Sequence, residues 1–547
     1  MYTLIKVSLF RTVAMENLVE VATAEGELFG GIHMSNITLY ERMKKAFALT
    51  LALVLVLFIV LQLAPTTNLS ASNASAQRAS NNGNIPKYIF LFIGDGMSYV
   101  QVQSASYYLG SLNSEYGTEQ VDLSFMDFPT VGTAMTWDLT SFAPDSASTA
   151  TAIATGNKTW SGTINMDSTL TKPLETITEK LKNQLGYGIG IISSVNIDHA
   201  TPAAFYAHQP SRGNVYEIGL EMISSNFDYF AGGMLQSARL TDRKAILELA
   251  TEAGYTVHTT YAASATLKPS DGKAILIAEN LDSGLAMNYS LDALPGEWSL
   301  ADYTAKGIEM LHANFGDTGF FMMVEGGKVD WAGHANDAAA NIHDMLAMDD
   351  AIKLAIEFYN KYPDDTLIIV TGDHETGGMT IGFAGTDYDT FMANLAQQSV
   401  TYEVFSNVNV KEYKENNTPF STVLNDIESL FGLMRSSRAA RAAHPTLVLN
   451  EYEMVMLRDA YERTLKTGSG TKDTMTQAEY VLYGTYDPLT VTITHILNNK
   501  SGIGWTSYAH TGVPVPVFAL GVGSDLFEGY YHQEEIFYVL AGLTNVN

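Results

Sequence analysis

The sequence has 547 residues, of which 46% are hydrophobic and only 16% are charged. This composition indicates a folded protein with a large core and excludes a disordered or fibrous chain. The absence of cysteine excludes disulfides, thiolate metal sites and cysteine nucleophiles. Lys and Arg number 31 and Asp and Glu number 59, and the formal charge of −28 argues against nucleic-acid binding.

The N-terminal part of the chain has the pattern of a secretory signal. An uncharged apolar run covers residues 46–64 and follows several basic residues. We expect a signal peptide at 43–76 and a linker at 77–85, with the protein exported to the periplasm or secreted. Without cleavage, the apolar run would anchor the chain in a membrane. Residues 1–42 are interpreted as an extension that is non-native or of unexplained role, with Met43 as the biological start.

From residue 88 onward, short apolar runs alternate with longer helical patterns. The runs end in polar or glycine-rich loops, and they read YIFLFI, GIGII, FFMMV, LIIVT and VPVFALG. Helices are expected at 146–156, 174–185, 216–226, 243–253, 335–359 and 451–465. This alternation predicts an α/β fold with a central, mostly parallel sheet flanked by helices. Residues from about 384 to 500 are rich in Tyr, Asn and charge, and we interpret them as a large insertion, either a cap or a dimer-forming element.

Acidic and imidazole side chains follow several of the predicted strands. In open α/β sheets, ligands bind beyond the carboxyl ends of the strands, where these residues gather. One Asp after a strand is more often a helix cap than a metal ligand. The whole set, without thiols, suits zinc beside a harder ion such as magnesium. Its members are Asp95, Glu325, Asp330, His334, Asp373, His374 and His510, with His199 and Thr201 after GIGII.

A nucleophile candidate is Ser146, in the stretch FAPDSASTATAIATG. Pro144 halts the preceding segment, and the small residues that follow can enter a helix. A serine at a helix N-terminus lies in a positive field beside free N–H donors. The alternative is that Asp145 or Ser146 simply caps the helix. Arg212, in HQPSRGN, is a candidate anion clamp because a guanidinium can hold two phosphate oxygens at once.

Six motifs occur in order along the chain: GDGMS, PDSASTATA, DHATPAAFYAHQPSR, VEGGKVDWAGH, TGDHETGG and AHTG. In these motifs the sequence resembles the alkaline phosphatase family, from about residue 86 to the C-terminus. The resemblance implies an alkaline-phosphatase-like catalytic domain at 86–547 and a homodimer. It also implies hydrolysis of phosphate monoesters to alcohol and inorganic phosphate at alkaline pH.

The same resemblance implies roles for individual residues. Ser146 would be the nucleophile that forms a phosphoserine intermediate, and Arg212 would clamp the phosphate. The cofactors would be two zinc ions and one magnesium ion. The first zinc would be held by Asp330, His334 and His510, the second by Asp95, Asp373 and His374, and the magnesium by Asp95, Thr201 and Glu325.

Two positions depart from one bacterial version of the family. His199 stands where that version has Asp, and Trp331 stands where it has Lys. The pair resembles cold-adapted bacterial forms, and we expect His199 to be an outer partner of the magnesium site rather than a ligand. Trp331 supplies no cation beside the phosphate, so phosphate release and pH dependence are expected to differ.

Three other functions fit the motifs less well. A phosphodiesterase of the same superfamily usually has Thr as its nucleophile and lacks the third metal site. A non-catalytic phosphate-binding metalloprotein would not need Ser146. A sulfatase would have Cys or Ser two residues before the proline of HQPSR, where this chain has His208.

Overall fold

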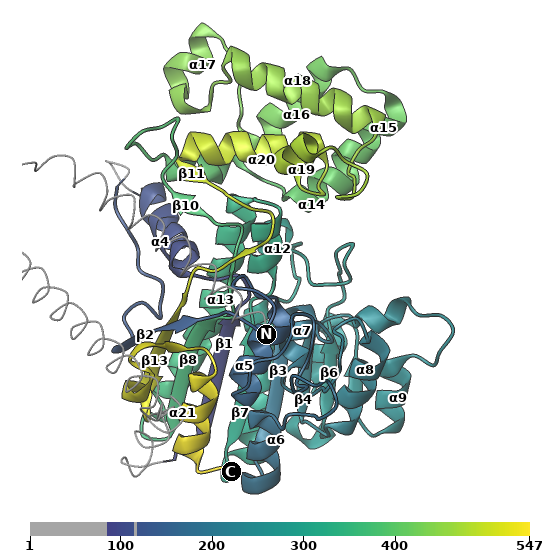
Figure 1. Cartoon of the computed structure of the whole chain (residues 1–547), viewed down its shortest axis with the longest axis vertical. Helices are drawn as coiled ribbons and strands as arrows, with labels where there is room; N and C mark the ends of the chain where they lie inside the picture. The colour runs from purple at the N-terminus through teal and green to yellow at the C-terminus, as the bar shows by residue number, and fades with distance from the viewer. Residues whose placement is uncertain (1–84, 114–117) are drawn as a thin grey trace, which may run out of the picture. The chain divides into compact units, whose positions relative to one another are not determined.

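The computed structural model describes residues 85–113 and 118–547, which belong to one compact unit (Figure 1). The expected signal peptide at 43–76 and the extension at 1–42 lie outside the described residues. Among the helices that the structure describes, none is long and apolar enough to cross a membrane.

A ten-stranded sheet forms the centre of the fold. Its neighbours pair in parallel except at β13, which runs antiparallel to both β2 and β8. The mostly parallel α/β fold is therefore confirmed. In spatial order the strands are β14 (Gly529–His532), β2 (Thr130–Met135), β13 (Val515–Gly521), β8 (Thr366–Gly372), β1 (Tyr88–Gly94), β7 (Phe320–Glu325), β3 (Gly188–Asn196), β4 (Tyr229–Gly233), β6 (Ala274–Ile277) and β5 (Thr256–His258).

The central strands are buried along their whole length and mostly apolar, as expected for strands with helices on both faces of the sheet. Alternate residues of β1 enter two different cores: Phe90 and Phe92 join one cluster, while Leu91 and Ile93 join the other. Since β1 pairs in register with β7 and β8, the carboxyl ends of the three strands lie at one edge. The loops that leave this edge carry most of the predicted site.

Helices pack against both sides of the sheet. The first core contains residues of α4 (Tyr99–Asn113), α11 (Leu300–Phe315) and α13 (Ala338–Tyr359). The second contains residues of α5 (Ser146–Thr155), α6 (Ile177–Lys180), α7 (Ala200–Ala203), α8 (Val215–Ser224), α9 (Ile246–Glu252) and α21 (Glu535–Thr544). A short helix, α10 (Tyr261–Thr266), precedes β6.

The helix expected at 335–359 starts later than predicted and follows a separate short helix, α12 (Lys328–His334). Asn336, with a φ of 51°, separates α12 from α13. The sequence pattern did not detect this break because Asn disturbs a helical pattern less than Gly or Pro. The break allows α12 to turn away from α13 and present Asp330 and His334 to the strand ends.

Most of residues 384–500 is helical and is drawn green and yellow in the upper part of Figure 1. The helices are α14 (Tyr402–Val404), α15 (Lys411–Asn416), α16 (Phe420–Phe431), α17 (Arg438–Ala443), α18 (Glu451–Lys466), α19 (Gln477–Tyr483) and α20 (Pro488–Ser501). Two small antiparallel pairs join the chain segments on either side of this part: β10 (Thr380–Ile381) with β11 (Ile503–Gly504), and β9 (Glu375–Thr376) with β12 (His510–Thr511). That the region is an insertion remains a prediction.

Candidate metal centre

Three groups of acidic and imidazole side chains gather at the carboxyl edge of the sheet. Asp95 directly follows β1, Glu325 ends β7, and Asp373 directly follows β8. All three carboxylates are fully buried. The loops around them place them close together because the strands are neighbours in register.

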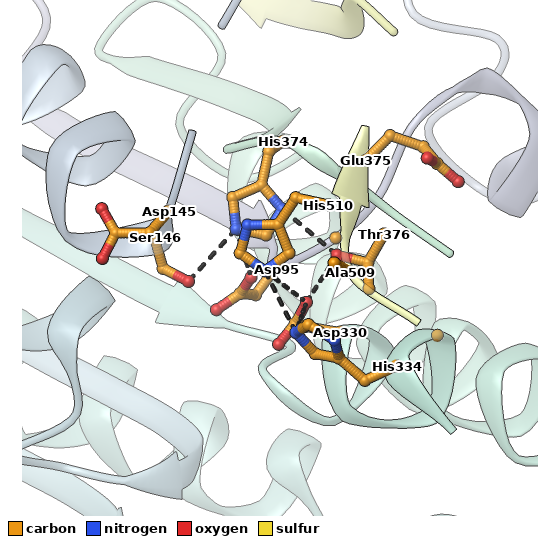
Figure 2. A network of polar contacts seen from close by, with 12 residues as sticks. Asp95, Asp145, Ser146, Asp330, His334, His374, Glu375, Thr376, Ala509 and His510 are labelled. Carbon is orange, nitrogen blue, oxygen red and sulfur yellow. Dashed lines mark hydrogen bonds and ion pairs between the residues drawn. The ribbon is translucent and has the colours of Figure 1, made fainter. Parts of the chain in front are cut away.

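The first group consists of Asp330 and His334, one turn apart on α12, and His510 on β12. Asp330 Oδ1 lies 3.4 Å from His334 Nε2 and 3.5 Å from His510 Nε2. The two Nε2 atoms are 3.1 Å apart, and Figure 2 shows both rings directed at the same carboxylate. The three side chains can therefore offer one cation three ligand atoms.

The second group consists of Asp95, Asp373 and His374. His374 Nε2 lies 3.3 Å from Asp95 Oδ1 and 3.3 Å from Asp373 Oδ2. The imidazole of His374 stacks on that of His510, with ring centroids 3.6 Å apart. The first and second groups are therefore immediate neighbours, as Figure 2 shows.

The third group contains Asp95, Glu325 and His199. Thr201 lies beside it and donates its hydroxyl to Asp95 Oδ2 at 3.2 Å. Ser193 donates a short hydrogen bond to Glu325 Oε2. The structure thus brings the predicted residues Asp95, Thr201 and Glu325 together and adds His199 to them. The role of His199 as an outer partner stays a prediction.

Ser146 is the first residue of α5 and is almost fully buried. Asp145 caps the helix and accepts the backbone N–H of Ser148 at 3.1 Å, which leaves the Ser146 hydroxyl free to point at the second group (Figure 2). Ser146 Oγ lies 3.1 Å from His374 Nε2. The cap is therefore Asp145, and Ser146, the nucleophile candidate, is the first residue of the helix.

Arg212 lies on the other side of Asp145. Its Nη1 donates to Asp145 Oδ2 at 3.0 Å, and its Nη2 lies 3.1 Å from His199 Nε2. The side chain keeps 31% of its surface exposed. A guanidinium held in this way can turn N–H groups toward an anion bound beside Ser146.

The acidic groups of the site are not neutralised by the protein. Burial, with Asp373 as a close like charge, raises the pKa of Asp95 well above its usual range. Burial also raises the pKa of Glu325 to about 8 and that of Asp373 to about 7. Burial lowers the pKa of His199 to about 3 and moves that of His374 well below its ordinary value.

Asp330 is the exception. Burial alone would raise its pKa, but His334, His510 and His374 together hold it below its ordinary value. Three atoms in the third group, Asp95 Oδ1, Glu325 Oε1 and His199 Nδ1, are buried without a hydrogen-bond partner. Buried carboxylates with free lone pairs are the ligands that hard divalent cations use in proteins, whereas His199, whose Nε2 accepts from Arg212, carries its proton on Nδ1. The residues therefore fit bound metal ions.

The structure also shows a residue that sequence reasoning missed beside Trp331. Lys328 is fully buried and forms a short ion pair with Asp282. Its ammonium lies 4.5 Å from the centroid of the Trp331 ring and 4.1 Å from that of Tyr289. Trp331 in turn meets the His199 ring edge-on, with centroids 5.9 Å apart. A cation is thus present behind Trp331, although not beside the phosphate clamp.

Two further residues had a signal in the sequence, because they belong to the motif TGDHETGG. Glu375 is buried and accepts hydrogen bonds from Gln101 at 2.9 Å and from two backbone N–H groups of the following turn at 3.1 Å. Thr511 on β12 donates a short hydrogen bond to the same carboxylate. Glu375 therefore fixes the pairing of β9 with β12, which carries His510 to His374. Thr376, the second residue, contacts both the first and the second group, through Asp330 and His374 (Figure 2).

The sequence profile of the alkaline phosphatase family matches residues 86–229 and 281–546, which is more than half of the chain. This chain belongs to the alkaline phosphatase family. Alkaline phosphatase 4 of Bacillus subtilis is 30% identical over 508 residues, covering 91% of this chain and 96% of that protein.

Solved structures of alkaline phosphatases have the same fold. The cold-active enzyme of a psychrophilic Shewanella species superimposes with a TM-score of 0.67 at 26% identity, covering 84% of this chain and 99% of the other. The enzyme of the Antarctic bacterium TAB5 gives a TM-score of 0.55 at 25% identity, covering 85% and 99%. A His-to-Asp variant of the TAB5 enzyme, with the same TM-score, identity and coverage, was solved with Mg bound in its M3 site.

Proposed function

We propose that this protein hydrolyses phosphate monoesters at alkaline pH through a phosphoserine formed on Ser146, with two zinc ions and one magnesium ion bound. The contact between Ser146 Oγ and His374 Nε2, at 3.1 Å, carries the proposal. It supports Ser146 as the nucleophile, because a plain helix cap would not need its hydroxyl beside a group of candidate metal ligands. A protein that only bound phosphate would need the cation groups but not this hydroxyl.

The chain's own residues account for two displacements at phosphorus. The substrate phosphate lies at the N-terminus of α5, where Arg212 donates hydrogen bonds to its oxygens. Ser146 Oγ attacks phosphorus, the bond to the leaving oxygen breaks, and the alcohol departs with a proton. Water then attacks the phosphoserine, the phosphorus–Oγ bond breaks, and inorganic phosphate leaves while Ser146 regains its proton.

The residues that would hold the metals are those of the three groups. Asp330, His334 and His510 would hold one zinc, Asp95, Asp373 and His374 the other, and Asp95, Thr201 and Glu325 the magnesium. When bound, such cations supply Lewis-acid stabilisation of the serine alkoxide and of the leaving oxygen. A His-to-Asp variant of the TAB5 enzyme was solved with Mg bound, which supports magnesium as one of the cations of a related enzyme. His374 cannot act as a general base in this scheme because its Nε2 is directed at the cation.

The localisation and the oligomeric state of the enzyme are part of the same proposal. The pattern at 43–76 supports export to the periplasm or outside the cell. Family membership supports a homodimer, to which the region at 384–500 could contribute as an insertion.

The test compares the hydrolysis of p-nitrophenyl phosphate with that of bis(p-nitrophenyl) phosphate by the full chain, supplied with zinc and magnesium at alkaline pH. Ser146→Ala is the nucleophile-free variant, and Ser264→Ala, at a buried serine away from the site, is its matched control. We expect a strong preference for the monoester and at least about a 10³-fold loss of kcat in Ser146→Ala alone. A preference for the diester would identify a phosphodiesterase, and full activity of Ser146→Ala would contradict the nucleophile.

A further inference from the structure

Thr376 lies between the two zinc-type groups and contacts both of them (Figure 2). It is the second residue of β9, is fully buried, and pairs in register with His510 of β12. Its Oγ1 donates to Asp330 Oδ1 at 2.5 Å and lies 3.2 Å from His374 Nδ1. One hydroxyl therefore connects a carboxylate of the first group to an imidazole of the second.

The hydrogen count fixes the direction of both bonds. A hydroxyl has one hydrogen, and a carboxylate can only accept. Because the short contact to Asp330 uses that hydrogen, Thr376 Oγ1 must accept from His374, and His374 must carry its proton on Nδ1. The Nε2 of His374 then keeps its lone pair, and this is the atom that faces Ser146, Asp95 and Asp373.

The space around Thr376 allows little freedom. A Cβ atom added to Gly96 would lie 2.9 Å from Thr376 Oγ1, and one added to Gly333 would lie 3.1 Å from Thr376 Cβ and Cγ2. The glycines of GDGMS and VEGGKVDWAGH thus leave room for the side chain and restrain it. Glu375, the preceding residue, holds the strand by the bonds described above. The hydroxyl is therefore kept in one position by packing and by backbone pairing.

We propose that Thr376 is a positioning residue that couples the two zinc sites: one hydroxyl orients Asp330 in the first and selects the metal-binding tautomer of His374 in the second. The inference rests on the proposed zinc sites. If Thr376 couples the two sites, loss of its hydroxyl weakens zinc binding at both sites together, which the loss of packing contacts alone would not do. Partners of this kind typically change metal affinity by about 10- to 100-fold.

The test measures zinc affinity rather than activity. The purified full chain is stripped of metal and titrated with Zn²⁺ against a chromophoric chelator. Thr376→Val keeps the shape and removes the hydroxyl, Thr376→Ala removes it without any risk of excess bulk, and Thr376→Ser keeps it. Thr304→Val is the matched control, since Thr304 is also fully buried but donates only to Leu300 of its own helix, at 2.8 Å.

We expect two tight zinc equivalents in the unmodified protein and in Thr304→Val. Both equivalents should weaken about 10- to 100-fold in Thr376→Val and Thr376→Ala and recover to within about 3-fold in Thr376→Ser. Unchanged affinity in both hydroxyl-free variants, or weakening of one equivalent only, would overturn the coupling while leaving the proposed function intact. Failure of the unmodified protein to bind zinc would instead overturn the proposed function, and this inference with it.

Discussion

Ser146, His374 and Arg212 come from three separate parts of the chain, and each is held by a neighbour from its own motif. Asp145 caps the helix of Ser146 and also holds Arg212 at 3.0 Å. One carboxylate thereby sets the distance between Ser146, the proposed nucleophile, and Arg212, the proposed phosphate clamp. The Coulomb attraction of Arg212 and several hydrogen bonds keep the pKa of Asp145 below its ordinary value despite burial, so this carboxylate stays charged at working pH.

A second buried carboxylate, outside the three groups, makes stability depend on pH. Burial raises the pKa of Asp344 on α13 to about 7, whereas an Asp in an unfolded chain has a pKa of about 4. Between these values the folded state binds a proton that the unfolded state does not. The stabilisation is therefore present below about pH 4 and is lost as pH rises through 7.

Replacing Asp344 by Asn removes this titration. We expect Asp344→Asn to melt roughly 1–3 °C higher than the unmodified protein at pH 8, with a smaller difference at pH 5. Circular dichroism recorded during thermal unfolding at pH 8 and at pH 5 measures the difference in melting temperature. Asp350→Asn, at a mostly exposed position of the same helix, is the control. A difference that does not grow with pH would contradict the assignment.

The sequence predicted the residues that line the candidate metal centre, but not the neighbouring residues that hold them in place. Ser146, Arg212 and all the predicted ligands come together at one edge, because they lie at strand ends or in the loops and short elements next to that edge. Lys328 could not be recognised, since its partners Asp282 and Tyr289 belong to a different segment. The bridging role of Thr376 was equally invisible, because it depends on two other segments meeting at one hydroxyl.

At the scale of elements, five of the ten strands were predicted. The five that were found are continuous apolar runs, and all of them lie in the middle of the sheet. Three of the five missed strands have weaker signals: β5 reads TVH and is only half-buried, β14 reads GYYH at the edge, and β2 alternates buried with more exposed positions. The other two, β4 (YFAGG) and β6 (AILI), are fully buried but short. Pairing with neighbours, rather than local preference, decides these strands.

The turn after β1 decides whether the first two groups can form. Gly96 has a φ of 77°, and a Cβ there would lie 2.9 Å from both Asp330 Cα and Thr376 Oγ1. We expect Gly96→Ala to destabilise the fold by about 2 kcal/mol or more and to lower kcat/KM about 100-fold, because displaced ligands misalign the reacting groups. Chemical denaturation and steady-state kinetics measure the two effects.

Gly254→Ala separates backbone strain from the clash. Gly254 also has a positive φ, of 89°, but a Cβ there would meet nothing within 4 Å. This variant should lose only about 1 kcal/mol of stability and keep full activity. Equal activity losses in the two variants would show that Gly96 matters for strain alone.

For the whole molecule, uncompensated buried charge explains why metal binding and folding should be linked. The chain carries a formal charge of −28, and several carboxylates of the centre are buried without a cationic partner. Metal ions that bind the folded arrangement and not the unfolded chain would stabilise the fold. The alternation of strands and helices predicted the sheet, but the helical region at 384–500 has no such repeat, and its arrangement came only from the structure.

Chelation therefore has a predicted effect on stability as well as on activity. Each site held at 100 times its Kd should contribute about 2.7 kcal/mol, so the stripped protein should melt several degrees lower. Adding zinc and magnesium back should restore both the melting temperature and turnover. Differential scanning fluorimetry with parallel assays follows the two readouts. Loss of activity with no change in melting would place the metals outside the buried centre.

A covalent intermediate on Ser146 is the central claim, and transfer of phosphate to a competing acceptor tests it most directly. The full chain, loaded with metal, hydrolyses p-nitrophenyl phosphate or glycerol phosphate in the presence of ethanolamine, and free phosphate and phosphoethanolamine are measured. If every substrate forms the same phosphoserine, the ratio of the two products must be the same for both leaving groups. A ratio that changes with the leaving group would mean that water and ethanolamine attack the substrate itself, and it would contradict the role given to Ser146.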